Sequence, residues 1–301
     1  MTTGTSAPAV ARPPVGVRLS GALYARPRVR LAALLSAPLL WLVVAYLGSL
    51  AVMFATAFWS VDSFTGSVIR QPTMDNFRSL LQESVYRRVA LRSLGVAGAV
   101  TVIDAAIALP MAFCMAKIAS ARAQRWLVAA VLTPLWASYL VKIYAWRTML
   151  SSHGVADWAL APFGLRGPGY GLAATVIALA YLWLPYMILP IYAGFQRLPD
   201  SLLEASSDLG ASTGRTFRSV AMPIVFPALV AGSIFTFSLS LGDYITVKIV
   251  GGSTQMFANI IYDNIGVASN LPFAAAAAFF PVIVIIIYLT LVRRTGALEN
   301  L

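Results

Sequence analysis

The run YGLAATVIALAYLWLPYMILPIYAGF, Tyr170 to Phe195, contains no charged residue. A helix needs about 20 apolar residues to cross the hydrocarbon core of a bilayer. The run is too long and too uniformly apolar for a barrel strand, which would alternate polar and apolar side chains. Because backbone groups in lipid must be hydrogen-bonded within the segment, the run predicts a transmembrane helix.

Comparable apolar runs recur along the whole chain. Of the 301 residues, 59% are hydrophobic and 11% are charged, whereas an ordinary soluble domain carries about 25% charged residues. We therefore expect an all-α polytopic membrane protein in contact with lipid. The runs predict six transmembrane helices, at about 31–59, 93–116, 126–150, 170–195, 221–250 and 274–292.

The remaining segments set the expected domain boundaries. Residues 1–30, rich in Ala, Pro, Gly and Arg, are expected to form a largely disordered basic tail in the cytoplasm. The first apolar run is too long for a cleaved signal peptide, so we expect it to be retained as a span. The six-span domain covers 31–295, and 296–301 form a short cytoplasmic tail.

Arginine and lysine set the expected orientation. With the N-terminus inside, thirteen basic residues fall in inner segments and six in outer segments. Because cytoplasmic loops carry the excess of Lys and Arg, this distribution predicts both termini inside. The net charge of +11 has the same explanation, so we expect no binding of nucleic acid. The first outer loop, roughly 61–92, is long enough for short amphipathic helices.

A polar segment, 197–220, lies between the fourth and fifth runs and faces the cytoplasm in this topology. Ser201 and Glu204 have the spacing of a capping box at the start of a short helix. Gly210 is placed to end that helix in the left-handed conformation. The spacing therefore predicts an ordered unit rather than an unstructured loop.

A second short helix is expected to follow. Ser212 or Thr213 would cap it, and it would run through Arg215 and Phe217 before Pro223. The polar segment would then be a compact helix–Gly–helix unit.

Four large apolar side chains lie in this segment, namely Leu202, Leu203, Leu209 and Phe217. Exposed leucines on a short helix are typical of a surface that inserts into a groove on a partner. The alternative is a solvated cytoplasmic loop that forms a capped turn. The residues by themselves leave both interpretations open.

The spacing within the segment resembles the EAA motif of permeases of ABC (ATP-binding cassette) importers. The Glu-Ala-Ser of 204–206, Gly210 after three residues, and the Val-Ala-Met-Pro of 220–223 after nine more follow the family's pattern. The departures from that pattern are conservative: Ser206 replaces Ala, Val220 replaces Ile and Met222 replaces Leu. In that family the segment forms a coupling helix that inserts into a cleft on the ATPase subunit.

The resemblance implies an ATPase-coupling site and a location in the bacterial cytoplasmic (inner) membrane. It also implies import of a small solute delivered by a periplasmic binding protein. The implied coupling residues are Ser201, Leu202, Leu203, Glu204, Ala205, Ser206, Asp208, Leu209, Gly210, Arg215, Phe217 and Pro223.

Two further stretches resemble the polyamine branch, in particular the first-permease type of spermidine/putrescine systems. They are SYLVKIYAW (Ser138–Trp146) and SLGDYITVKIVGG (Ser240–Gly252). The branch implies a polyamine such as spermidine or putrescine as the solute. Relatives that carry amino acids or opine-like compounds share much of these stretches, so those solutes are the alternative.

The chain has no nucleotide-binding motif of its own. It contains no G-x-x-x-x-G-K-[S/T] and no Gly-Lys pair, so ATP and Mg²⁺ would be bound by separate ATPase subunits, two of them by the resemblance. His153 is the single histidine, and we interpret it as a loop residue rather than a metal ligand. We expect no cofactor, no metal and no catalytic activity in this chain.

The sequence shows no convincing internal repeat, so the second half of the permease is expected to be another chain. The resemblance implies a related but different permease, which would give a heterodimer. A homodimer is the alternative.

Ionisable residues inside spans are expensive in lipid and are therefore candidates for function. A polycation needs carboxylates and aromatic faces along its path. The candidates for the substrate pathway are Asp104, Tyr139, Tyr144, Trp146, Trp183, Asp243 and Tyr244. In the alternative interpretation, Asp104 pairs with Lys142 or Arg147, Asp243 lies near Lys248, and the aromatic residues only anchor the spans at the interface.

Two other classes of membrane protein are less consistent with the sequence. An ion-driven secondary transporter would also bury ionisable residues, but it would not explain the spacing of the polar segment. A lipid or glycan transferase would need carboxylates or histidines clustered at one interface, which the sequence lacks.

The first outer loop provides a test of the topology. A reporter that needs disulfide bonds, such as alkaline phosphatase, becomes active only in the oxidising periplasm. Fused after Gly66, it is expected to be active in whole cells. A fusion that is expressed but inactive would contradict the predicted orientation.

Overall fold

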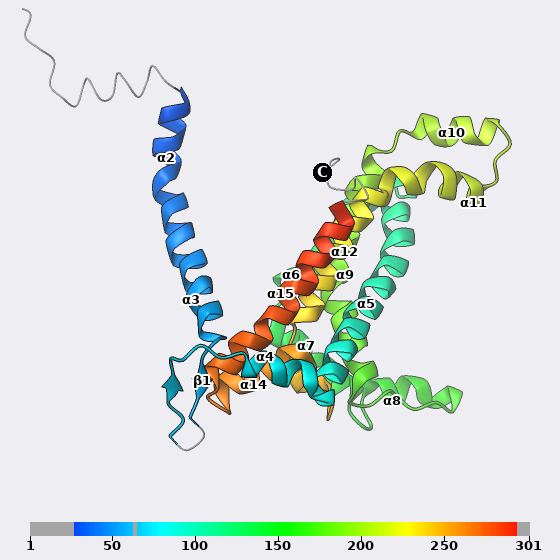
Figure 1. Cartoon of the computed structure of the whole chain (residues 1–301). Helices are drawn as coiled ribbons and strands as arrows, with labels where there is room; N and C mark the ends of the chain where they lie inside the picture. The colour runs from blue at the N-terminus through cyan, green and yellow to red at the C-terminus, as the bar shows by residue number, and fades with distance from the viewer. Residues whose placement is uncertain (1–26, 63–64, 294–301) are drawn as a thin grey trace, which may run out of the picture. The chain divides into compact units, whose positions relative to one another are not determined.

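The computed structural model describes residues 27–62 and 65–293 (Figure 1). The chain divides into two compact units, one ending at Ala55 and the other beginning at Thr56, and each is described by itself. The predicted tails, 1–30 and 296–301, lie outside the described residues except for 27–30, which are helical.

The first unit contains the first predicted span. Helix α2 (Pro27–Trp41), the π-helical segment η1 (Leu42–Leu47) and helix α3 (Gly48–Thr56) follow one another without a break. The helix already includes Pro27, ahead of the predicted start, because the two arginines that precede the apolar run are good helix formers.

In the second unit, a hairpin and a short helix precede the second span. Strands β1 (Ser60–Val61) and β2 (Val68–Ile69) pair antiparallel. They are the only strands among the described residues, and all other regular secondary structure in that part of the chain is helical. Helix α4 (Asp75–Gln82) is the kind of short helix expected in the first outer loop.

The second span is longer than predicted. Helix α5 (Ser84–Phe113) continues through a π-helical turn, η2 (Cys114–Ile118), as one long helix. The apolar run begins near Ser93, but three arginines occupy the first turns of the helix and hide them from a hydropathy pattern. The helix continues through them because arginine favours helical backbone.

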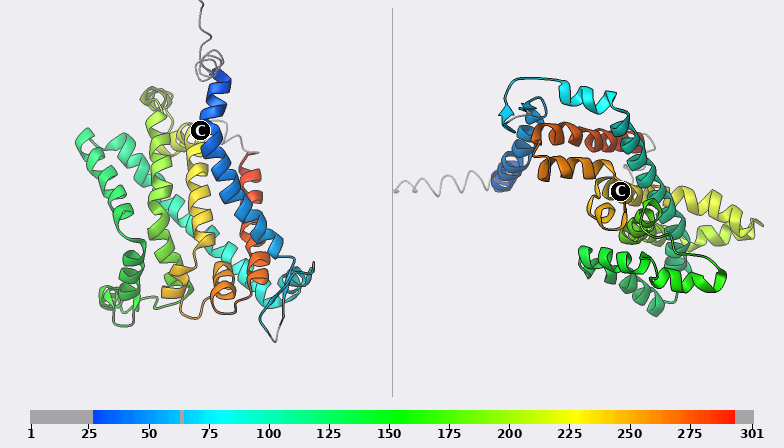
Figure 2. Two further views of the ribbon diagram at one scale, coloured as in Figure 1. Left: turned by 90° about the vertical axis from the view of Figure 1, so that its left-hand side faces the viewer. Right: turned by 90° about the horizontal axis from the view of Figure 1, so that it is seen from below.

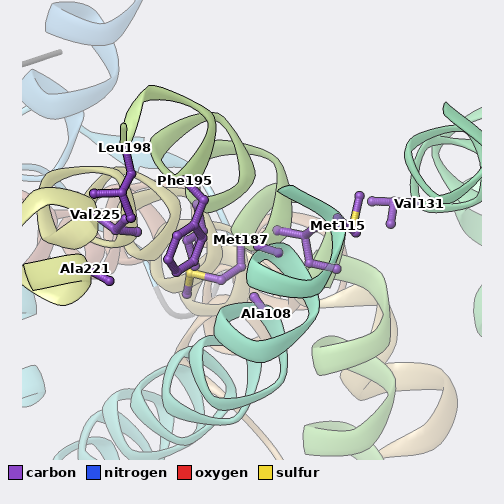
Figure 3. Packing of buried hydrophobic residues seen from close by; sticks show 11 residues of the cluster. Ala108, Met115, Val131, Met187, Phe195, Leu198, Ala221 and Val225 are labelled. Carbon is purple, nitrogen blue, oxygen red and sulfur yellow. The ribbon is translucent and has the colours of Figure 1, made fainter. Parts of the chain in front are cut away.

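Helices α5, α9 (Leu172–Arg197) and α12 (Met222–Gly242) form the packed centre of the second unit, and α9 contacts both of the others extensively (Figure 2). Buried side chains from these helices, from η2 and from the π-helical turn η4 (Phe217–Ala221) meet in one hydrophobic cluster (Figure 3). Its members include Ala108, Met115, Met187, Phe195, Ala221 and Val225. The core therefore lies where the second, fourth and fifth spans meet.

Small residues let α9 and α12 approach closely. A Cβ at Gly194 would lie 2.7 Å from the Cβ of Ala228, and a Cβ at Gly232 would lie 2.9 Å from the sulfur of Met187. In lipid the hydrophobic effect does not drive helices together, so close van der Waals packing through small residues takes its place.

The third predicted span, 126–150, is broken. It consists of α6 (Ala121–Trp136) and α7 (Tyr139–Leu150), whose axes are bent by 94°. The backbone is extended at Ala137, directly after the turn that contains Pro134. Proline removes a backbone donor and disturbs the preceding turn. The apolar run did not reveal the break because hydropathy does not report backbone conformation.

The fifth predicted span, 221–250, also divides. Helix α12 ends at Gly242, and a separate short helix, α13 (Ile245–Val250), follows a break at Asp243 and Tyr244. Two residues that were expected inside a helix therefore lie at an irregular point of the backbone.

The remaining helices connect or complete the bundle. They are α8 (Val155–Leu160), α14 (Phe257–Gly266) and α15 (Leu271–Arg293), the last of which is the sixth predicted span. Within 27–62 and 65–293, five helices are long and apolar enough to cross a membrane, or six if α6 and α7 count as one bent span.

The close approach of α9 and α12 leads to a stability prediction. Gly194→Ala is expected to destabilise the protein by about 1–3 kcal/mol, because the added Cβ would force the two helices apart. Gly98→Ala on α5 is the matched control, since a Cβ there meets no atom within 4 Å. Melting temperatures measured in detergent check the prediction, and equal values for the two variants would contradict it.

Candidate functional site

The polar segment begins with α10 (Asp200–Asp208), as predicted, but the predicted capping box is not formed. Pro199 occupies the N-cap position, so Ser201 and Glu204 lie inside the helix, and no side chain caps its N-terminus. The helix starts earlier than the motif indicated because Asp200 fits its first turn, where a negative charge is favourable.

Gly210 ends α10 in the left-handed conformation, as predicted, with φ of +74°. Its N–H donates to the carbonyl oxygen of Ser207 at 2.8 Å, and the N–H of Ala211 donates to that of Ser206 at 3.1 Å. These two bonds form a Schellman motif. Since L side chains rarely adopt this φ, glycine fixes the turn that leads to α11 (Thr213–Thr216).

The second short helix is not separate from the fifth span, which corrects the prediction. Helix α11 continues through a π-helical turn, η4 (Phe217–Ala221), into α12, and Pro223 lies in the first turn of α12. The N–H of Met222 donates to the carbonyl oxygen of Phe217, five residues earlier. This wider turn accommodates the proline without ending the helix. Ser212 occupies the N-cap position, although its side chain makes no capping bond.

The four apolar side chains of the segment divide into two pairs. Leu209 is 88% exposed, and Leu202 is also exposed. Leu203 and Phe217 instead pack against the hydrophobic core, where the ring of Phe217 lies 6.1 Å from that of Phe113. The sequence predicted four exposed side chains, but two of them anchor the segment because its inner face rests on α5 and α9.

The other predicted coupling residues lie on the outer surface of the segment or hold its two helices together. The exposed ones are Ser201, Glu204, Ala205, Asp208, Arg215 and Pro223. The hydroxyl of Ser206 lies 2.8 Å from that of Thr216, which joins α10 to α11.

Lys117 fastens the start of α10 to the end of the second span. Its Nζ donates to the carbonyl oxygen of Leu198 at 2.5 Å and to Oδ1 of Asp200 at 2.6 Å. The lysine side chain is mostly buried, whereas that of Asp200 is exposed. A displacement of α10 would therefore be transmitted to η2 and α5.

A second group of predicted residues meets at the break between α12 and α13. The carboxylate of Asp243 accepts hydrogen bonds from the hydroxyl of Tyr139 on α7, and from the N–H and hydroxyl of Thr246 at 2.8 and 3.0 Å. The rings of Tyr139 and Trp183 are stacked with their centroids 6.0 Å apart. Residues from the third, fourth and fifth spans thus converge on one buried carboxylate.

Tyr139, Trp183, Asp243 and Tyr244 line one cavity of about 280 Å³. Helices α7, which carries Tyr139, and α14 both lie at the end of the bundle opposite α10 and α11 (Figure 1). The chain therefore has two candidate sites, one at each end of the same helical core.

Asp104 does not belong to this cavity. It is fully buried on α5, and neither carboxylate oxygen has a hydrogen-bond partner among the described residues. It does not pair with Lys142 or Arg147, so that alternative is not supported. The hydroxyl of Thr236 on α12 is likewise buried without a partner in the described part of the chain.

Tyr144 and Trp146 also lie apart from the Asp243 cavity. Tyr144 is exposed on α7, and the ring of Trp146 contacts that of Tyr181 with centroids 5.4 Å apart. The structure therefore gathers four of the seven predicted pathway residues.

Asp243 forms no ion pair with Lys248, so the alternative interpretation of Asp243 gains no support from such a pair. Lys248 forms an ion pair with Asp263 on α14, with 2.7 Å between Nζ and Oδ1. Its ammonium also lies 4.1 Å from the ring centroid of Tyr262, which stacks on Tyr244. Asp243 is therefore held by uncharged hydrogen-bond donors.

Outside the spans, Asp157 organises the connection between α7 and α9. Its carboxylate accepts hydrogen bonds from the N–H of His153 at 2.7 Å and from that of Gly167 at 2.6 Å. These bonds hold the pKa of Asp157 below its ordinary value. His153 thus lies in a turn, and the described residues include no cluster of three or more His, Cys, Asp or Glu that could hold a metal ion.

Comparison with known proteins identifies the class. Residues 18–295 match the family described as the inner membrane component of binding-protein-dependent transport systems. The chain belongs to this ABC permease family. The permease is 41% identical over 305 residues to the inner membrane ABC transporter permease protein YdcU of Escherichia coli. The alignment covers 96% of this chain and 97% of that protein.

A second relative carries a more specific name. The permease is 29% identical over 233 residues to the spermidine/putrescine transport system permease protein PotB of Haemophilus influenzae, covering 76% of this chain and 81% of that protein. Together, the relatives and the apolar helices establish the permease as a multi-pass inner membrane subunit of a bacterial ABC importer.

Solved structures share the fold of the permease. A chain of a bacterial ABC transporter that imports alginate matches with a TM-score of 0.69 at 16% identity, covering 92% of this chain and 99% of that chain. A chain of the inward-facing methionine transporter MetNI matches with a TM-score of 0.55 at 19% identity. The match covers 69% of this chain and 93% of that chain. At these identities the likeness concerns the fold alone.

Sequence reasoning missed three contacts of the permease. Thr246 follows Asp243 at the spacing of a helix-capping pair, which is a signal that could have identified it. The contacts of Lys117 with Asp200 and of Lys248 with Asp263 left no such signal, because each joins residues of different helices.

Proposed function

We propose that this permease imports a polyamine, such as spermidine or putrescine, which a periplasmic binding protein delivers and separate ATPase subunits drive. The observation that carries the proposal is the Asp243 carboxylate, which lines a cavity together with the stacked rings of Tyr139 and Trp183. The name of the spermidine/putrescine relative supports the same solute.

The chemistry of this cavity suits a polyamine. Such a solute carries ammonium groups separated by apolar methylene chains. A carboxylate attracts an ammonium, and an aromatic face adds a cation–π contact of about 0.5–2 kcal/mol. A pathway must bind its solute weakly enough to release it, so a few separate contacts are more suitable than one deep site.

The exposed surface of α10 is proposed to dock on an ATPase subunit. Leu202 and Leu209 project outward from it, next to exposed charged residues such as Glu204. The contact of Lys117 with Asp200 and the continuous helix from α11 to α12 link this surface to the core helices. Movement of the ATPase would therefore reach the spans through two connections.

The remaining parts of the proposal concern assembly and topology. Both termini and α10 face the cytoplasm, and a second, different permease supplies the other half of the pathway. Two ATPase subunits bind ATP and Mg²⁺. Their closure shifts the permease between two conformations, an equilibrium that the loaded binding protein also biases. Asp104, which is buried and has no hydrogen-bond partner in the described part of the chain, is proposed to meet the solute when α5, α9 and α12 separate.

Uptake of radiolabelled putrescine tests the function. Cells that lack other polyamine importers and express this permease with its partner subunits are expected to accumulate putrescine. Asp243→Asn is expected to lower that uptake by roughly ten- to a hundredfold, because a charged hydrogen-bond partner contributes about 1.5–3 kcal/mol. Asp75→Asn, on the exposed helix α4, is the control and should transport normally.

Two results would contradict this proposal. Normal uptake by Asp243→Asn would remove that carboxylate from the pathway. Absence of putrescine and spermidine uptake by the wild-type transporter, with all subunits present in the membrane, would exclude a polyamine as the solute.

Copurification with the ATPase tests the coupling surface. Gly210→Pro should weaken association because proline cannot adopt the left-handed φ. Glu204→Lys should weaken association because it reverses a charge on the docking surface. Leu209→Ser should weaken it because it removes an exposed apolar side chain from that surface. Membrane insertion should be unchanged in all three variants. Leu165→Ser, at an exposed leucine of the opposite end, is the matched control. Wild-type association in all three variants would show that the segment is only a loop.

A further inference from the structure

We propose that Tyr244, Tyr262 and Asp263 form a second ammonium-binding site, which Lys248 fills in this structure and which an ammonium group of a polyamine fills during transport. The identity of the ligand as a polyamine rests on the proposed function. The existence of an ammonium site rests on the geometry of these four residues alone.

The ammonium of Lys248 has two kinds of partner. Its Nζ lies 2.7 Å from Oδ1 of Asp263 and 4.1 Å from the ring centroid of Tyr262. The ring of Tyr262 is in turn stacked on that of Tyr244, with centroids 4.4 Å apart and planes 21° from parallel. A carboxylate and an aromatic face thus converge on one primary ammonium.

Lys248 is chemically close to the end of a polyamine. Its side chain is a primary ammonium on a flexible stem of four carbons, and putrescine is a chain of four methylenes with an ammonium at each end. A site that accepts the ammonium of Lys248 offers the same carboxylate and ring to a solute ammonium. The Lys248 side chain therefore occupies the site as one end of a polyamine would.

The site adjoins the Asp243 cavity. A cavity of about 350 Å³ lies between α12, α14 and α15, and both Tyr244 and Tyr262 line it. Tyr244 also lines the cavity that contains Asp243. Two carboxylates, each accompanied by an aromatic ring, thus lie near the break between α12 and α13. They are Asp243 with Tyr139, and Asp263 with Tyr262. Two such sites suit a solute with two or more ammonium groups.

The two carboxylates differ in accessibility. The side chain of Asp263 is 35% exposed and that of Lys248 is 40% exposed, whereas Asp243 is buried. An exposed ion pair contributes only about 0–1 kcal/mol, so a solute ammonium can replace Lys248 without a large loss. We infer that Asp263 is met first, and Asp243 after it.

Lys248 would then act as a competitor that is permanently attached to the site. It neutralises Asp263 while the pathway is empty, and it returns to Asp263 when the solute moves on, which favours release. The alternative is an ion pair that only joins α13 to α14. The two interpretations differ in what removal of the lysine does to solute binding.

Direct binding of radiolabelled putrescine distinguishes them. The full chain, purified with its partner subunits in lipid nanodiscs, would be used. Lys248→Met is expected to bind putrescine about three- to tenfold more tightly, because the competing ammonium is gone. Asp263→Asn and Tyr262→Leu should weaken binding by a similar factor, and Tyr262→Phe, which keeps the ring, should resemble the wild type.

Arg147→Met is the matched control for the lysine variant. Arg147 also lies over an aromatic ring, 6.0 Å from the centroid of Tyr170, but it forms no ion pair with a carboxylate within the described ranges. Its removal should leave putrescine binding unchanged. Yield and size-exclusion profiles of each variant report folding, and the Lys248→Met result stands by itself if Asp263→Asn does not fold.

The outcomes for site and function are separable. Unchanged, weaker or undetectable binding by Lys248→Met overturns the site, whatever the wild-type transporter carries. Uptake into proteoliposomes with the ATPase and binding protein adds a kinetic test, in which Lys248→Met should lower both KM and kcat. If Lys248→Met binds more tightly but the wild type imports no polyamine, the site stands and the polyamine-import proposal fails.

Discussion

Close packing of α9 against α12 is the contact on which the other features of this permease depend. Gly194 and Gly232 lie where the two helices meet and have no side chain. The helices pack so closely there that even a Cβ at either position would clash with the facing helix. The same helices position residues of the candidate pathway, because α9 contributes Trp183 and Asp243 directly follows the end of α12. A change in this packing would alter the pathway directly.

The irregular points of the backbone coincide with the candidate sites. In lipid, a broken helix is tolerated only where the protein satisfies the freed backbone groups. At the break after α12, Asp243 accepts the N–H of Thr246, so the carboxylate that is proposed to meet the solute also stabilises the break. At the other end, the π-helical turn before Pro223 lets the polar segment run directly into a span. Function and backbone irregularity thus share the same residues.

Much of this arrangement could be predicted from single residues and their spacing. Gly210 was recognised as a left-handed helix end because few other residues adopt that conformation. The capping box at Ser201 and Glu204 was predicted wrongly, because Asp200 lets the helix begin earlier. The inward packing of Phe217 depends on Phe113, a residue about a hundred positions away, and no local pattern reports such a contact.

The sequence by itself determined that the chain spans a membrane, where its apolar runs lie, and that a polar segment with the spacing of a permease motif separates two of them. These properties follow from local composition and from the need to satisfy the backbone in lipid. Only the tertiary structure decided where the third and fifth spans break and which carboxylate meets which partner. Lys248 pairs with Asp263 rather than Asp243 because pairing depends on how α13 and α14 lie in space, and hydropathy and spacing along the chain carry no record of that geometry.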